Sequence, residues 1–320
     1  MNQGDKVSSA ARCAWLGASV FAIGLTFLSA AFAQISAPLP QEARTALERA
    51  QASAAKALQT YDTYRPDQPL FREAVRYGRE AAQLAPDNPE PLRFLAEVYS
   101  VTDFYGPAFR NWQAYLEAGG ALTRDMREQA VEVGTELAYE RYSQDDKDEA
   151  LRLYQEVIDL VPDDPEAYTW AGRILLETDR PESAITYWQE VAELKPGDDS
   201  AQYFLELAQE RSRYGTEAVT AFREGVRLYE AGDRRAAREQ FARATSLNDR
   251  YPAAWAYLGR TAFETNNYAA AETFYQNATQ LEPDNQTYRY FFEESQRRQG
   301  EEADVEDEQQ SRPFREESGN

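Results

Sequence analysis

Histidine is absent from the 320 residues of this chain, and Cys13 is its single cysteine. Histidine is the usual general base at neutral pH and the commonest metal ligand, so its absence removes the most familiar routes to catalysis and to zinc binding. No glycine-rich run precedes a lysine with the spacing of a phosphate-binding loop. The sequence therefore predicts neither an enzyme nor a cofactor, and only oxygen ligands are left for a metal.

Basic residues are also few. The chain has 34 Lys and Arg against 55 Asp and Glu, a net charge of −21. A charge of that sign repels phosphate backbones, so we expect no nucleic-acid partner. A cluster within residues 145–149 could in principle bind calcium, but it lacks the spacing of a calcium loop and falls on an expected turn between helices. We interpret the cluster as a solvated turn.

The first 33 residues have the three parts of an export signal in order. Lys6 and Arg12 precede an uncharged apolar run at residues 14–28, and the small–x–small site at residues 31–33 follows it. We expect cleavage after this site, which would place a cysteine-free mature chain in the periplasm or cell envelope. The alternative is a retained membrane anchor, because residues 14–33 form an uncharged stretch of 20 residues, about long enough to span a bilayer.

A 34-residue pattern recurs along most of the chain. In residues 252–285 a first apolar set has the spacing i, i+3, i+4, i+7, i+8 of one helical face, and a second set at helical spacing ends at a proline. The members of the first set are Trp255, Leu258, Gly259, Ala262 and Phe263. The same template fits five other segments, residues 55–88, 89–122, 131–164, 165–198 and 218–251. The pattern predicts one pair of helices in each segment.

This pattern resembles the tetratricopeptide repeat family, whose unit has a large residue, Leu–Gly and Tyr in its first helix, then Ala, Phe, Ala and Pro. The resemblance implies an all-α superhelical solenoid of antiparallel helix pairs, about six repeats plus capping helices. Each unit alone has an apolar face that it cannot bury, so the units stack. Small residues such as Gly259 are expected where two helices approach closely.

Departures from the repeat register set the expected domain boundaries. An insertion at residues 123–130 is expected to lengthen one first helix, with Thr123 as its N-cap. An odd helix at residues 199–217 is expected to close the first block. The expected divisions are a signal peptide at 1–33, an N-terminal capping helix and lead-in at 34–54, a first block at 55–217, a second block with a C-terminal capping helix at 218–299, and an acidic tail at 300–320. The tail has too few apolar residues to fold, so we expect disorder there.

The resemblance also implies a binding surface. In this family the first helix of each repeat lines a concave groove, and carrying those positions over gives Phe94, Tyr139, Trp170, Arg173, Arg223, Tyr257 and Arg260. Exposed aromatics beside arginines are typical of binding hot spots, so we expect an acidic or C-terminal peptide to bind at Trp170 and Arg173. The alternative is that several of these aromatic side chains only pack between helices.

These observations predict an exported, non-catalytic scaffold that binds a protein or peptide through its concave groove and contacts the membrane only through the signal segment. Two other functions are left open. One is a structural component of the cell envelope that assembles by stacking its faces. The other is a cell-wall carbohydrate binder, because groove aromatics can stack on sugars.

Overall fold

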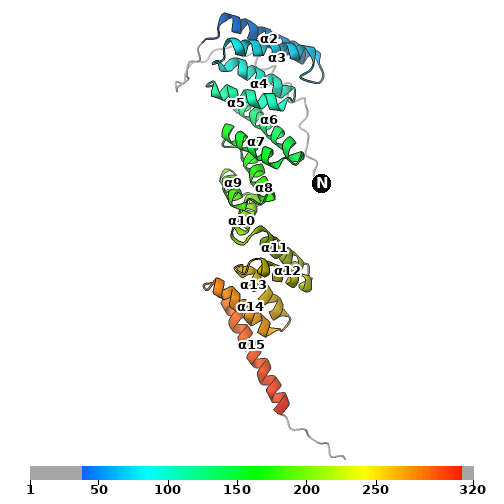
Figure 1. Cartoon of the computed structure of the whole chain (residues 1–320), viewed down its shortest axis with the longest axis vertical. Coiled ribbons are helices and arrows are strands. Elements are labelled where there is room, and N and C mark those ends of the chain that lie inside the picture. The colour runs from blue at the N-terminus through cyan, green and yellow to red at the C-terminus, as the bar shows by residue number, and fades with distance from the viewer. Residues whose placement is uncertain (1–37, 312–320) are drawn as a thin grey trace, which may run out of the picture. The chain divides into compact units, whose positions relative to one another are not determined.

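The computed structural model describes residues 38–311, and every regular element within them is a helix (Figure 1). The fourteen helices are α2 (Gln41–Thr60), α3 (Pro69–Leu84), α4 (Pro89–Val101), α5 (Tyr105–Glu117), α6 (Arg124–Ser143), α7 (Lys147–Leu160), α8 (Pro165–Glu177), α9 (Pro181–Leu194), α10 (Asp199–Tyr214), α11 (Thr216–Glu230), α12 (Arg234–Leu247), α13 (Pro252–Glu264), α14 (Tyr268–Leu281) and α15 (Gln286–Ser311). Consecutive helices pack on each other in pairs, such as α4 with α5 and α6 with α7. The predicted all-α array of helix pairs is therefore confirmed.

The turn has one recurring conformation in five of the pairs, namely α4–α5, α6–α7, α8–α9, α11–α12 and α13–α14. Three residues separate the two helices, and the middle one has a positive φ, for example 64° at Asp145 and 87° at Gly232. Aspartate, asparagine and glycine tolerate this left-handed region better than other residues do. These residue types therefore reverse the chain in a short space.

Within a helix pair, large side chains of the second helix pack against small residues of the first helix. A Cβ atom added to Gly225 would lie 2.5 Å from the Phe241 ring, and one added to Gly259 would lie 2.7 Å from the Tyr275 ring. Both rings are buried. The expected close approach at Gly259 is thus present, and the aromatic ring of the second helix is what fills the space.

The insertion at residues 123–130 has the predicted effect. Helix α6 begins at Arg124 and continues for 20 residues, longer than the 13 residues of α8. The Thr123 hydroxyl accepts a hydrogen bond from the Met126 amide at 3.4 Å, as an N-cap does. The threonine cap and the lengthened helix are both confirmed.

The division into blocks differs from the prediction. The chain forms two compact units, one that extends to Thr178 and includes Glu190–Gly197, and one made of Asp179–Gln189 and the chain from Asp198 onward. Helix α10, expected to close the first block, belongs to the second unit. Tyr214 stacks on Tyr251 with ring centroids 4.1 Å apart, which fixes the end of α10 to that unit. The repeat pattern showed a helix without a partner but could not show which neighbour it packs on.

Both ends of the array also differ from the prediction. Helix α2 begins at Gln41 and packs along α3, so the expected cap at 34–54 and the start of the unit expected at 55 are one continuous helix. At the other end α15 continues to Ser311, so the expectation of disorder is wrong for residues 300–311. Arg297 forms ion pairs with Glu294 and Glu301, one helical turn away on each side, and such pairs favour a solvated helix.

The export signal and residues 312–320 lie outside the described residues. Within residues 38–311, none of the helices combines the length and the apolar character that crossing a bilayer requires.

Five successive helices occur twice. Helix α12 begins and ends 87 residues after α7, and the same shift relates α13 to α8 and α14 to α9. Helix α15 begins 87 residues after α10 begins. Helices α6 and α11 end 87 residues apart as well. We call α6–α10 the first copy and α11–α15 the second copy, and this correspondence makes it possible to compare side chains position by position.

Candidate functional site

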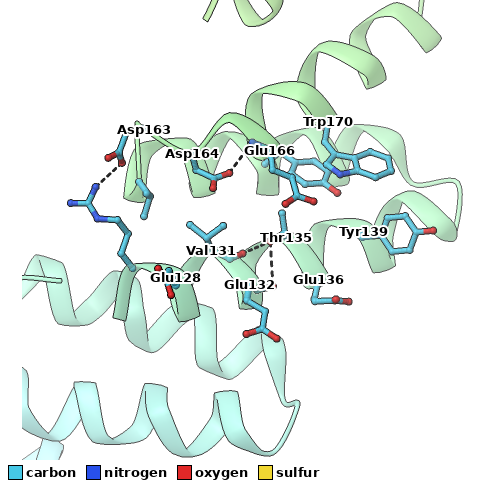
Figure 2. Close-up of a pocket in the computed structure, with 13 residues that line it drawn as sticks. Glu128, Val131, Glu132, Thr135, Glu136, Tyr139, Asp163, Asp164, Glu166 and Trp170 are labelled. Atoms are coloured by element: carbon cyan, nitrogen blue, oxygen red, sulfur yellow. Dashed lines mark hydrogen bonds and ion pairs between the residues drawn. The ribbon is translucent and has the colours of Figure 1, made fainter. Parts of the chain in front are cut away.

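The first unit contains a cavity of ≈840 Å³ formed by α6, α7 and α8. Figure 2 shows Tyr139 and Trp170 together at one end and acidic side chains along the remainder. The residues that line the cavity are Arg127, Glu128, Val131, Glu132, Thr135, Glu136, Tyr139, Tyr154, Val161, Asp163, Asp164, Glu166 and Trp170. Two of them, Tyr139 and Trp170, are among the groove residues expected from the sequence.

The aromatic end of the cavity is an ordered cluster. The ring of Trp170 lies parallel to that of Tyr154, with an interplanar angle of 3° and centroids 5.9 Å apart. Tyr139 and Tyr142 meet the same indole edge-on, at 5.4 and 5.2 Å. Trp170 is half-buried by these contacts, whereas Tyr139 is 48% exposed. The cluster thus has a fixed inner face and an accessible outer ring.

The rest of the lining is acidic. Its carboxylates belong to Glu128, Glu132, Glu136, Asp163, Asp164 and Glu166. Arg127 is the one basic residue among the lining side chains, and its Nη1 lies 2.6 Å from Asp163 Oδ1. The Asp164 side chain is also engaged, because it caps α8 by accepting from two backbone amides. The cavity therefore has an excess of negative charge.

Arginines at the expected groove positions do not supply free positive charge. Arg173 stacks over Trp170 at 5.1 Å, but its Nε donates to Glu177 Oε1 at 2.9 Å. Arg260 pairs in the same way with Glu264 at 3.2 Å. These ion pairs weaken the electrostatic basis for the expected acidic peptide at Trp170 and Arg173, because a carboxylate of the chain lies beside each cation.

Glu177 joins the three helices around the cavity. Its carboxylate accepts from Tyr142 of α6 at 3.0 Å and from Arg173 of its own helix, and Lys147 of α7 lies 3.4 Å away. Burial by itself would raise the pKa of Glu177, but the hydrogen bonds from these three groups outweigh it and lower that pKa. The junction holds α8, and with it Trp170, against α6.

The repeat template did not identify Glu177. A signal was available in the sequence, because the second copy has the same residue types 87 positions later, with Tyr229, Arg260 and Glu264 in place of Tyr142, Arg173 and Glu177. In the structure the Tyr229 hydroxyl donates to Glu264, and Arg234 Nε lies 3.1 Å from the same carboxylate. The junction is therefore built twice.

The cavity itself is not built twice. Phe222 occupies the position of Thr135, and Tyr251 occupies that of Asp164. Both aromatic side chains are buried, 4.8 Å apart, and Phe222 also meets Tyr257 edge-on at 5.5 Å. In the second copy aromatic side chains thus fill the space that is open in the first.

The second unit has a separate, more apolar cavity of ≈460 Å³ among α13, α14 and α15. Tyr257 and Arg260, two of the expected groove residues, line it together with Phe263 and Phe291. Arg223 is elsewhere, because its guanidinium bonds to Glu210 of α10 at 2.8 Å.

Phe94 was expected in the groove, and the structure places it in the core. Its side chain is only 5% exposed and packs on Gly78 of α3. The template position alone could not show this, because the neighbouring helix decides whether a ring is covered. Among residues 38–311 no group of three or more acidic side chains is arranged to hold a metal ion.

Comparisons with known proteins agree with this architecture. A family model described as "Tetratricopeptide repeat" matches residues 135–199 and 222–285, two segments whose starts are 87 residues apart. The search of curated proteins gave no match.

Several solved structures are similar to the chain. The structure titled MamA protein is 18% identical over 53% of this chain and 82% of its own, with a TM-score of 0.24. YrrB, described as a TPR protein with an unusual peptide-binding site, is 16% identical over 68% and 97%, with a TM-score of 0.27. A tetratricopeptide repeat protein from Parabacteroides merdae is 12% identical over 80% and 100%, with a TM-score of 0.32. The two segments that match the tetratricopeptide repeat model, residues 135–199 and 222–285, both lie in the helix pairs of the array.

Proposed function

We propose that this chain is a non-catalytic scaffold that binds a segment of a partner protein in the cavity formed by α6, α7 and α8. The observation that carries the proposal is the aromatic end of that cavity, where a half-buried Trp170 adjoins an exposed Tyr139. Tryptophan and tyrosine are among the residues that contribute most to binding energy in protein interfaces, and ligand sites are usually concave.

The side chains at this surface are held in place before any partner arrives. Trp170 is stacked on Tyr154, and the Glu177 junction ties its helix to α6 and α7. A surface that is already ordered loses little conformational entropy on binding, so more of its contact energy appears as affinity. This rigidity favours a binding role for the aromatic cluster.

Photo-crosslinking tests the proposal. A photoreactive phenylalanine analogue placed at Tyr139 of the full chain should form a discrete adduct with the partner in the cells of origin. The same analogue at Tyr290, which is 59% exposed in the second unit, serves as the matched control. The Tyr139 adduct should vanish when Thr135→Phe fills the cavity as Phe222 does in the second copy. Equal adducts at both positions, or adducts that persist with Thr135→Phe, would contradict the proposal.

We also propose that the protein is exported and acts in the periplasm or cell envelope. The basis is the sequence, in which Lys6 and Arg12 precede the apolar run at residues 14–28 and the small–x–small site at residues 31–33. A scaffold in that compartment gains from having its one cysteine in the removed segment, because the mature chain would have no thiol to oxidise.

A further inference from the structure

One buried hydroxyl group in the cavity has no partner. The side chain of Tyr154 is fully buried, and its hydroxyl makes no hydrogen bond within residues 38–311. Burial raises the pKa of this hydroxyl, so it is protonated at neutral pH. A buried polar group without a partner is unfavourable, and this one lines the cavity, where a bound group could pair with it.

The second copy shows what the same framework looks like without this hydroxyl. Phe241 occupies the position of Tyr154 and packs on Tyr257, as Tyr154 packs on Trp170. The aromatic pair is thus kept, although its rings are tilted by 40° instead of 3°, whereas this hydroxyl is absent from the second copy. Tyr251 of the second copy also has a buried hydroxyl without a partner within residues 38–311, so the Tyr154 hydroxyl indicates a ligand only together with the open cavity that Tyr154 lines.

The two copies also differ in the charge of their lining. In the first copy six positions are acidic, namely Glu128, Glu132, Glu136, Asp163, Asp164 and Glu166. The corresponding residues of the second copy include no acid and are Gly215, Val219, Arg223, Arg250, Tyr251 and Ala253. Acidic residues are therefore not required at these positions by the repeat fold. Their concentration around one cavity favours a cationic occupant.

We propose that the cavity binds an arginine or lysine side chain of a basic peptide segment in the partner protein, an inference that rests on the binding function proposed above. The alkyl stem and cationic head of such a side chain match the faces of Trp170 and Tyr139. Its N–H groups would donate to the Tyr154 hydroxyl. The carboxylates of Glu136 and Glu166 act on Tyr154 electrostatically and would pair with the same cation.

Two substitutions distinguish binding in the cavity from nonspecific attraction of a basic peptide to an acidic protein. Neither of them changes the net charge of the chain. Thr135→Phe fills the cavity with the ring that Phe222 provides in the second copy. Tyr154→Phe removes only the hydroxyl, as Phe241 does. Both replacements are residues that this fold already accepts at the matching positions. Tyr290→Phe, at an exposed tyrosine of the second unit, is the control.

A random-peptide phage library selected on the immobilised full chain, with counter-selection on the Thr135→Phe variant, identifies the preferred chemistry. The selected peptides should share an arginine or lysine at one position. Calorimetry with the synthetic peptide should show affinity lower by about tenfold or more for Thr135→Phe and Tyr154→Phe, and unchanged for Tyr290→Phe. Circular dichroism should show each variant to be folded.

The other outcomes are distinguishable. Selected peptides that have no shared basic residue but still lose affinity with Thr135→Phe would overturn the cationic occupant and leave the binding function standing. Peptides whose affinity is the same for wild type, Thr135→Phe and Tyr154→Phe would overturn both, because binding would then lie outside the cavity. A selection that yields no saturable binding also overturns both.

Discussion

Replacing Gly134 with alanine tests the packing that supports the cavity. Gly134 lies in α6, and an added Cβ would be 2.4 Å from Val157 Cγ2 of α7 and 2.6 Å from Phe109 Cε2 of α5. Ordinary contact begins at 3.4 Å, so each neighbour must move by up to about 1 Å. Val157 and Phe109 are 0% and 1% exposed, so neither can move without displacing other core atoms.

A matched substitution isolates the packing cost. Gly106 is also helical, but its added Cβ would find only Arg110 Nη1 at 3.6 Å. Both replacements gain helix propensity, at most about 1 kcal/mol, which largely cancels in the comparison. Overpacking a core costs about 1–3 kcal/mol, so Gly134→Ala should be less stable than Gly106→Ala by about that amount.

Urea unfolding followed by circular dichroism measures the difference. Because the two compact units need not unfold together, hydrogen exchange should be used to locate the loss of protection, which we expect in α5, α6 and α7. If Gly134→Ala proves as stable as Gly106→Ala, these three helices do not pack as described.

Two further predictions concern charge and processing. The pKa of Glu177 is lowered, so its stabilising contribution should be complete above its ordinary pKa of 4.5 and lost as the pH falls through the lowered value. Glu177→Gln should therefore cost about 0.5–1 kcal/mol at pH 7, because solvent screens this exposed group, and much less in acid. Thermal melts at several pH values measure the difference, and a cost that does not change with pH would mean that the charge is irrelevant. Intact-mass measurement of the protein from its native cells should give a chain that begins at Gln34. A mass that includes residues 1–33, in protein extracted only by detergent, would instead indicate a membrane anchor.

The helices could be predicted from the sequence because the features that specify a helix lie within the helix and next to its ends. Apolar spacing located the helix pairs, and a threonine before a charged first turn identified the cap at Thr123. Errors arose where a neighbouring segment decides the outcome. The position of Phe94 in its helix is right, but Gly78 on another helix leaves room that buries the ring. Likewise, the pattern gave the length of α10 and not the unit on which it packs.

The site was predictable only in part for the same reason. Tyr139, Trp170 and Arg173 were expected together and lie together. Whether a cavity exists beside them depends on Thr135, which the repeat template does not constrain. The sign of its charge depends on acidic residues from α6 and α8, which are 30 or more residues apart in the chain and are brought to one cavity by the fold.

Because the arrangement of α6–α10 recurs in α11–α15, the two copies can differ in one place: the first has an open cavity where the second has a buried ring. In the second copy the Phe222 ring is buried against Tyr257 and fills that place. The first copy has the smaller Thr135 at that place, so only this copy lacks the packing of the ring. The matching contacts of Glu177 and Glu264 hold the helices in the same arrangement in both copies. A single smaller side chain in one copy can thus give a repeated helix arrangement an open surface, with no new element added to the fold.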